Sequence, residues 1–178
     1  KRWLPCNMIR PPERDSLPEY YRKYYDYLQG DDVLRSLHEQ AADIQSLADG
    51  LATEREGFAY APDKWSLREV VGHLIDTERI LAYRALRISR NDSVELPGFN
   101  ENEYVKNFDF NRFPLADLVR EWLTVRVATI SLFEKMDDGY LERIGKANQV
   151  SISPRMLAFF IFAHAAHHLN VINDRYLS

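Results

Sequence analysis

The segment between Ser153 and Leu169 constrains the fold more than any other part of the chain. Ser153 and Pro154 form a typical helix start, in which a capping hydroxyl is followed by proline in the first turn. The stretch from Met156 to Ala166 is then apolar on nearly every side of the helix. Because such a helix must be covered by neighbours all round, we expect it to be the most buried helix of an α-helical protein.

Two further helices are predicted before it. After Asp31, a candidate cap, apolar residues recur at intervals of three and four as far as Leu51. The second of these helices has the clearest start in the sequence, because Ser66 and Glu69 form a capping box ahead of an apolar run. It is expected to end near Ser89.

A third helix is predicted to open with Pro114 and to end at residues 137–139, where two aspartates precede a glycine. No long run alternates with a period of two, although residues 148–152 are expected to form a short extended piece. The predicted class is therefore all-α, with four helices packed as a four-helix bundle.

The connection between the second and third helices, residues 91–113, sets the topology. It holds about twenty residues, which is long for a bundle. Since an extended chain covers about 3.3 Å per residue, the connection can return along a whole helix. We therefore expect the third helix to lie parallel to the second and the fourth antiparallel to both, in up-down-down-up order.

At 178 residues the chain is long enough for one domain with a substantial core. We expect a single domain over residues 1–178. Within it, residues 31–178 form the bundle. Residues 1–30, rich in proline and tyrosine, form an arm packed on the bundle.

Charge and hydropathy argue against several classes of partner. A net charge of −4 and a pI near 5.8 leave no basic field for nucleic acid. The longest apolar stretch, interrupted by His164, falls short of the roughly 20 residues of a membrane span. The start of the chain lacks a secretory pattern, and the single cysteine, Cys6, excludes an internal disulfide framework. We expect a cytoplasmic protein.

Three histidines are the candidate metal ligands. His164 and His168 are four residues apart, which puts their imidazoles on one helix face about 40° apart. His73 lies in the core-facing stripe of the second helix. It lies about 10 Å from that helix's start, while His168 and His164 lie about 12 and 18 Å from the end of theirs, so antiparallel packing brings them level. Because unpartnered buried imidazoles are costly, we predict a metal bound by His73, His164 and His168.

Three other residues are candidates for the same site. His167 adjoins His168 but lies about 100° around the helix from it, so the two cannot easily both point inward. His38 is a rival ligand, yet it lies beside the apolar stripe of its helix, which favours exposure. Asp76, one turn after His73, is a candidate acceptor for the ring N–H or simply a surface carboxylate.

Three neutral imidazoles favour Zn²⁺ or Ni²⁺, with Fe²⁺, Co²⁺ or Mn²⁺ as alternatives. Three protein ligands leave coordination positions open for water or substrate, as catalytic sites do. The predicted partner is therefore a small-molecule substrate.

The chain resembles the DinB/YfiT-like superfamily, in particular its DinB_2-type branch. Residues 65–79, WSLREVVGHLIDTER, resemble the second-helix signature of that branch, and residues 82–87 continue it. Residues 97–102, PGFNEN, resemble the following loop, and residues 164–168, HAAHH, the fourth-helix motif. The resemblance spans almost the whole chain and includes the tyrosine-rich arm.

The resemblance implies a bundle with a long crossover, a metal on His73, His164 and His168, and a homodimer. Members of the superfamily join low-molecular-weight thiols to electrophiles, which makes a thiol-dependent S-transferase the leading expectation. A thiol entering an open metal position would lose its proton and become the nucleophile. Two departures limit what the resemblance implies. The family loop commonly has aspartate where this chain has Asn100, so no carboxylate role is carried over there. Residues 169–172 differ from the Arg-Gly-Gln of other family branches, so substrate contacts are not transferred.

Two alternatives to a transferase remain. The first is a metal-dependent hydrolase, for which Glu101 and Glu103 are the candidate general bases. The second is a non-catalytic protein in which the metal only stabilises the bundle or the chain acts as a binding module.

Overall fold

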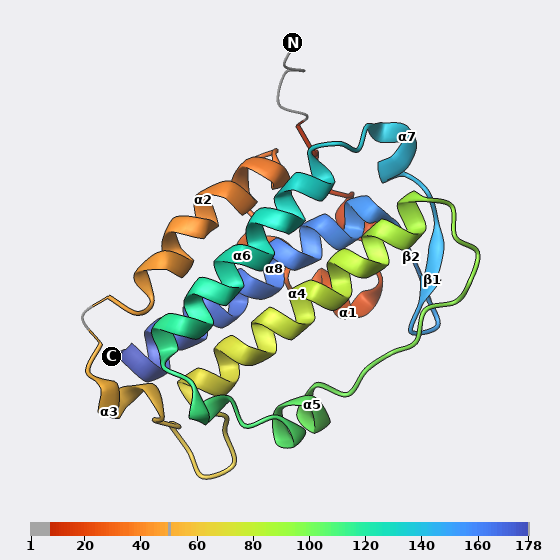
Figure 1. Cartoon of the computed structure of the whole chain (residues 1–178). Helices are drawn as coiled ribbons and strands as arrows, with labels where there is room; N and C mark the ends of the chain where they lie inside the picture. The colour runs from red at the N-terminus through yellow and green to blue at the C-terminus, as the bar shows by residue number, and fades with distance from the viewer. Residues whose placement is uncertain (1–7, 50, 178) are drawn as a thin grey trace.

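The computed structural model describes residues 8–49 and 51–177, so Cys6 and the first part of the arm lie outside it. Four long helices lie side by side (Figure 1). They are α2 (Val33–Ser46), α4 (Leu67–Ser89), α6 (Leu115–Phe133) and α8 (Pro154–Ile172). The shorter helical pieces are η1 (Arg14–Ser16), α1 (Glu19–Arg22), η2 (Tyr25–Tyr27), α3 (Thr53–Glu56), α5 (Glu101–Asn107), η3 (Phe110–Arg112), α7 (Asp138–Leu141) and η4 (Asn173–Leu177).

Helices α4 and α6 run in the same direction, and α2 and α8 run in the opposite one (Figure 1). Hydrogen bonds agree with the parallel pair, because Arg68 near the start of α4 reaches Asn111 just before α6, whereas Glu78 farther along contacts Trp122. The structure confirms the up-down-down-up four-helix bundle.

The helix starts follow the expected side chains. Ser66 and Glu69 form both hydrogen bonds of the capping box that opens α4. The Ser153 hydroxyl accepts from Met156 N at the start of α8. Asp32, one residue beyond the predicted Asp31, caps α2.

Two predicted helix ends are wrong by several residues. Helix α2 ends at Ser46, because the chain tightens into a turn in which Leu47 N donates to Ile44 O. Helix α6 ends at Phe133. Asp137 instead starts the short helix α7, since its carboxylate accepts from Tyr140 N.

The crossover after α4 carries structure of its own, which the sequence did not predict. Asn100 caps α5 by accepting hydrogen bonds from two backbone amides. The crossover runs back along α4, because Pro97 O accepts from Arg84 near the end of that helix and Asn111 lies beside Ser66 at its start. This path makes the parallel arrangement of α4 and α6 possible.

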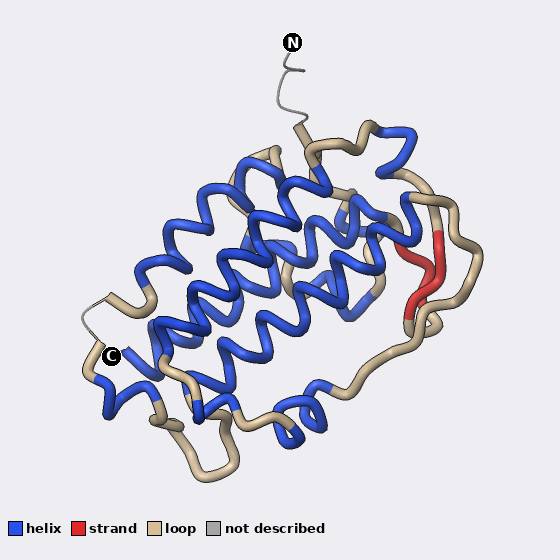
Figure 2. The backbone as a smooth tube through the Cα atoms, in the orientation of Figure 1, coloured by secondary structure: helices blue, strands red, loops and turns tan. Residues whose placement is uncertain are grey.

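A two-stranded hairpin precedes α8 (Figure 2). Strands β1 (Gly145–Ala147) and β2 (Val150–Ile152) are antiparallel, and the turn residues Asn148 and Gln149 have φ of 51° and 64°. Two positive φ values are typical of a two-residue hairpin turn. The extended piece predicted at 148–152 is confirmed at 150–152, which form β2, whereas its first two residues form the turn. Leu96 of the crossover hydrogen-bonds Lys146 O and Asn148 N, which fixes the hairpin to the crossover.

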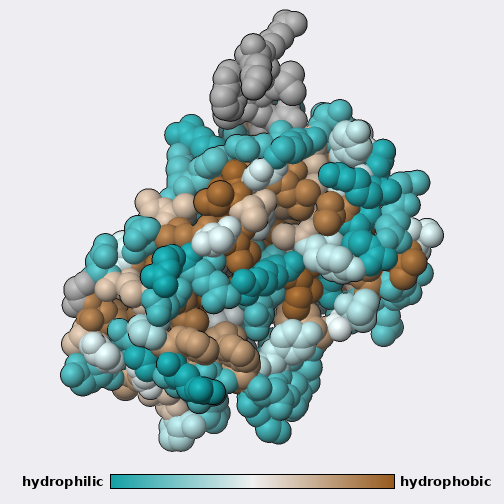
Figure 3. All heavy atoms as spheres, in the orientation of Figure 1, coloured by the Kyte–Doolittle hydropathy of each residue, from teal (hydrophilic) through white to brown (hydrophobic). Residues whose placement is uncertain are grey.

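Helix α8 lies at the centre of the core. Nine consecutive residues, 157–165, are buried, and the apolar residues of the helix belong to both halves of the core. Together with η4 this segment is long and apolar enough to cross a membrane by length and composition, but most of it is covered by the bundle. Its apolar surface is explained by its central position, as the sequence predicted. On the face shown in Figure 3, hydrophobic residues are interrupted by hydrophilic ones.

Candidate metal centre

The structure brings His73, His164 and His168 together. His73 projects from α4, and His164 and His168 project from successive turns of α8. The Nε2 atoms of His73 and His164 are 3.3 Å apart, and candidate ligand atoms of all three residues lie within 4.8 Å of one another. His73 and His164 are buried and His168 is partly buried. Antiparallel packing of α4 and α8 therefore brings the three imidazoles to a similar height along the bundle, as the sequence predicted.

The donor set fits a divalent ion. Two nitrogens bound to one tetrahedral zinc at about 2.0–2.1 Å would be about 3.4 Å apart, close to the 3.3 Å between His73 and His164. Burial lowers the pKa of His73 to about 4 and that of His168 to about 3, and it holds the pKa of His164 well below its usual range. The imidazoles are therefore neutral at pH 7, the state that metal coordination requires.

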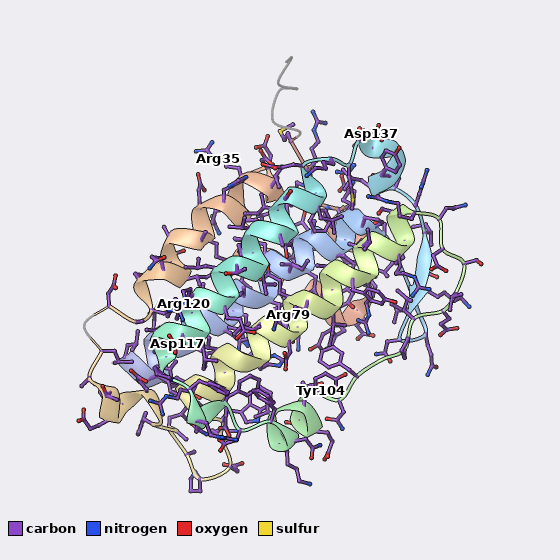
Figure 4. The ribbon with its side chains drawn as sticks, in the orientation of Figure 1. Arg35, Arg79, Tyr104, Asp117, Arg120 and Asp137 are labelled. Atoms are coloured by element: carbon purple, nitrogen blue, oxygen red, sulfur yellow. The ribbon has the colours of Figure 1, made fainter. Side chains whose placement is uncertain are left out.

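Thr77 rather than Asp76 lies against the imidazole of His73. Its Oγ1 is 3.4 Å from His73 Nδ1, a long hydrogen bond that leaves Nε2 directed at the other two histidines. Thr77 follows His73 by four residues and so lies on the same helix face. Asp76 is half-buried and lines a different cavity, together with Arg79 and Tyr104. Figure 4 shows Arg79 on α4 and Tyr104 on α5.

The other two candidate histidines do not join the cluster of three, although His167 lines the same cavity. His167 Nδ1 is 2.8 Å from the hydroxyl of Tyr27, and its ring is directed at the arm. His38 is exposed and its Nε2 is 3.4 Å from Glu134. Neither belongs to the cluster that could hold an ion.

The three histidines line a cavity of about 480 Å³. Its walls come from the arm, α4, the crossover, the hairpin and α8. Most of the lining is aromatic or apolar, with few polar groups besides the histidines, which is typical of small-molecule sites. The wall residues beyond the three histidines are Pro18, Tyr20, Tyr21, Tyr24, Trp65, Thr77, Leu81, Arg84, Phe99, Glu101, Asn148, Val150, Phe160 and His167.

Two charged side chains line this cavity among the described residues. Glu101, the first residue of α5, is exposed, and its charge raises the pKa of His73 against the larger effect of burial. Arg84 is only 6% exposed and donates from Nη2 to Pro97 O at 2.7 Å. Glu103 lines the separate cavity beside Asp76. The structure thus separates the two acids that the sequence left as equal candidates.

Sequence reasoning missed Arg84 and the tyrosines of the arm as parts of the site. A signal for Arg84 was present, because it follows His73 by eleven residues, about three helical turns. The arm gave no comparable signal. Its tyrosines reach the site through contacts with Phe160, whose ring centroid is 4.1 Å from that of Tyr21.

The helix order defines a four-helix bundle. The three histidines form a candidate site for a metal ion between the antiparallel helices α4 and α8. The family model of the DinB superfamily, DinB_2, matches residues 36–172. The chain belongs to the DinB superfamily.

A solved structure has a similar fold. It is that of YfiT from Bacillus subtilis, which is described as a probable metal-dependent hydrolase with an unusual four-helix bundle topology. The TM-score is 0.71 at 15% sequence identity, over 93% of this chain and 91% of YfiT. No curated protein matches the sequence.

Proposed function

We propose that this chain is a divalent-metal-dependent hydrolase in which His73, His164 and His168 hold the ion. The observation that carries the proposal is that Glu101 lines the same cavity as the three histidines. Among the described residues it is the only acidic side chain there. The description of YfiT as a probable metal-dependent hydrolase supports the same class of reaction.

Several wall residues would have a part in such a reaction. An ion at the three imidazoles supplies Lewis acidity, which favours attack by water at neutral pH. The Glu101 carboxylate accepts the proton of the attacking water as general base. Thr77 fixes the ring of His73, and the aromatic walls keep bulk water from the substrate.

The test compares Glu101→Gln with Glu103→Gln, a matched loop substitution beside the other cavity. Both variants and the wild type are loaded with Zn²⁺, Ni²⁺, Mn²⁺, Fe²⁺ or Co²⁺ and assayed on chromogenic esters, amides and phosphoesters. Glu101→Gln should lower kcat by about 10²- to 10⁴-fold, and Glu103→Gln should leave it within twofold. The proposal is overturned if no metal raises hydrolysis above that of the metal-free protein, or if the two variants behave alike.

Thiol S-transfer, expected from the resemblance, is a second candidate. It is supported by the cavity of about 480 Å³, which has room for both a thiol and an electrophile beside the histidines. A thiol with a pKa near 8.5 needs less help from a base than water does. Metal-dependent conjugation of thiols to a chromogenic electrophile should therefore survive Glu101→Gln, whereas hydrolysis should not. If neither reaction responds to metal while the melting temperature does, the metal only stabilises the bundle.

We also propose that the protein forms a homodimer and that residues 1–178 form a single domain. Light scattering coupled to size-exclusion chromatography tests the first, and a single cooperative thermal transition tests the second.

A further inference from the structure

Arg84 is the one cationic side chain among the described residues that line the histidine cavity, and it has no carboxylate partner there. It is 6% exposed. Its single hydrogen bond runs from Nη2 to Pro97 O, at 2.7 Å. Nε and Nη1 have no acceptor among the described residues. The edge of the guanidinium that does not face Pro97, formed by the second Nη2 hydrogen and one of these two nitrogens, can therefore bind a ligand.

This arrangement differs from that of the other deeply buried arginine. Arg126 is fully buried, and it is neutralised by two hydrogen bonds to the carboxylate of Glu78. A buried guanidinium without such a partner is costly, and burial lowers the pKa of Arg84. A bound anion would offset this cost.

The described charges on and near the cavity walls are net positive, with Arg84 and Lys23 against Glu101. The three imidazoles are neutral and add no charge, and Glu101 is the only acid among the described wall residues. Lys23 Nζ lies 4.3 Å from the ring centroid of Tyr20, a wall residue, and its charge lowers the pKa of His164. The field therefore favours a negatively charged ligand.

We propose that Arg84 binds an oxyanion group, carboxylate or phosphoryl, of a small and otherwise apolar substrate. Arg84 lies on the same face of α4 as His73, about 16 Å farther along the axis. Its side chain leans toward the start of the helix, which shortens the gap to the histidines. The substrate extends between the aromatic walls, with its anionic end at Arg84 and its reacting end at the three histidines. The placement of the reacting end at the three histidines rests on the proposed hydrolase function. The placement of the anionic end at Arg84 does not.

The planar fork of Arg84 fits both oxyanions, since carboxylate and phosphoryl oxygens each accept two parallel N–H bonds. Phe99 adds an apolar surface beside the fork, with its ring centroid 5.9 Å from the guanidinium carbon. The anionic group would thus be bound beside an aromatic ring, away from bulk water.

Binding is measured by calorimetry and by fluorescence of Trp65, which lines the cavity. The probes are 4-phenylbutyrate, its neutral primary amide and phenyl phosphate, so that the two oxyanions are told apart by their affinities. The variants are Arg84→Met, Arg84→Lys and, as a matched control on the same helix, Arg79→Met, which lines the other cavity. Metal content and melting temperature are recorded for each variant.

Wild-type protein should bind at least one of the two anions more tightly than the amide. Arg84→Met should weaken anion binding by about 10- to 100-fold, with amide affinity and metal content within twofold of wild type. Arg84→Lys keeps the positive charge but lacks the planar guanidinium, and it should weaken anion binding by a smaller factor than Arg84→Met. It replaces the methionine variant in the test if that variant does not fold. Arg79→Met should change nothing.

The result is separable from the hydrolase proposal. His168→Ala should lose the metal yet keep the preference for the anion over the amide, because Arg84 is unchanged. Equal binding of anions and amide by the wild type, or equal effects of Arg84→Met and Arg79→Met, would overturn the assignment even in an active hydrolase. Preference for the anion without any hydrolysis would overturn the hydrolase and leave Arg84 as an anion site.

Discussion

The carboxylate of Glu78 accepts hydrogen bonds from both Nε and Nη2 of Arg126, at 2.8 and 2.9 Å, inside the bundle. The same carboxylate accepts from Trp122 Nε1, and Arg126 Nη1 donates to Gln40 at 2.7 Å. Gln40 in turn donates to Phe162 O. One polar network thereby connects α2, α4, α6 and α8, the four helices of the fold.

Replacement of Glu78 by glutamine should destabilise the protein strongly. A buried guanidinium would lose its counterion, and breaking one partner of a buried pair costs about 3–5 kcal/mol. Urea unfolding followed by circular dichroism measures the change. Glu121→Gln, which breaks an exposed pair with Arg79, is the matched control and should cost about 0–1 kcal/mol. Similar losses in the two variants would show that the buried pair has no special role.

Removal of metal should lower the melting temperature. An ion that binds only the folded state at a concentration 1,000 times its Kd adds about 4.1 kcal/mol of stability, and each kcal/mol is about 2–4 °C in a chain of this size. Scanning calorimetry before and after chelation tests this. His168→Ala should abolish the shift, whereas His38→Ala should retain it, since His38 is exposed and pairs with Glu134. A shift of equal size in both variants would place the ion elsewhere.

Gly72, the residue before His73, should not tolerate a side chain. A Cβ at this position would lie 2.3 to 2.5 Å from ring atoms of Phe110 in the crossover. The ring or the helix would have to move, and such overpacking costs about 1–3 kcal/mol, more than the helix propensity gained with alanine. Thermal unfolding of Gly72→Ala is compared with that of Gly57→Ala, where nothing lies within 4 Å. Gly72→Ala as stable as wild type would mean that the crossover is not fixed here.

Replacement of Asp76 by asparagine should stabilise the protein at pH 7. Burial raises the pKa of Asp76 above its ordinary value of 3.8, so the folded state disfavours the carboxylate. The native group therefore loses stability as the pH rises through its folded pKa, and the asparagine variant avoids that loss. Below the ordinary pKa both side chains are neutral and the advantage should vanish. Unfolding free energies at pH 3 and pH 7 test the sign, and an advantage equal at both pH values would contradict it.

Local signals accounted for the parts of the fold that the sequence predicted. The capping box of Ser66 and the four-residue spacing of His164 and His168 each lie within one helix, so short-range geometry suffices to interpret them. The parallel course of α4 and α6 followed from the length of the crossover alone. The placement of His73 against the other two histidines followed from helix length and direction.

Features that depend on distant segments could not be predicted in this way. Apolar periodicity favours Val125 over Arg126 on the inner stripe, yet Arg126 is buried because Glu78, on another helix, neutralises it. Arg84 is unusual only because no acid pairs with it from the described residues of the arm, the crossover or the hairpin. Such an absence becomes visible only when those segments are placed in space.

The walls of the histidine cavity come largely from segments outside the bundle. The arm supplies Tyr20, Tyr21 and Tyr24, while the crossover supplies Phe99 and Glu101. The imidazoles themselves are anchored on α4 and α8, the rigid framework. Substitutions in these outer segments can therefore change the shape of the cavity, and with it the molecules that fit, without altering the three histidines. The same bundle can in this way serve different reactions.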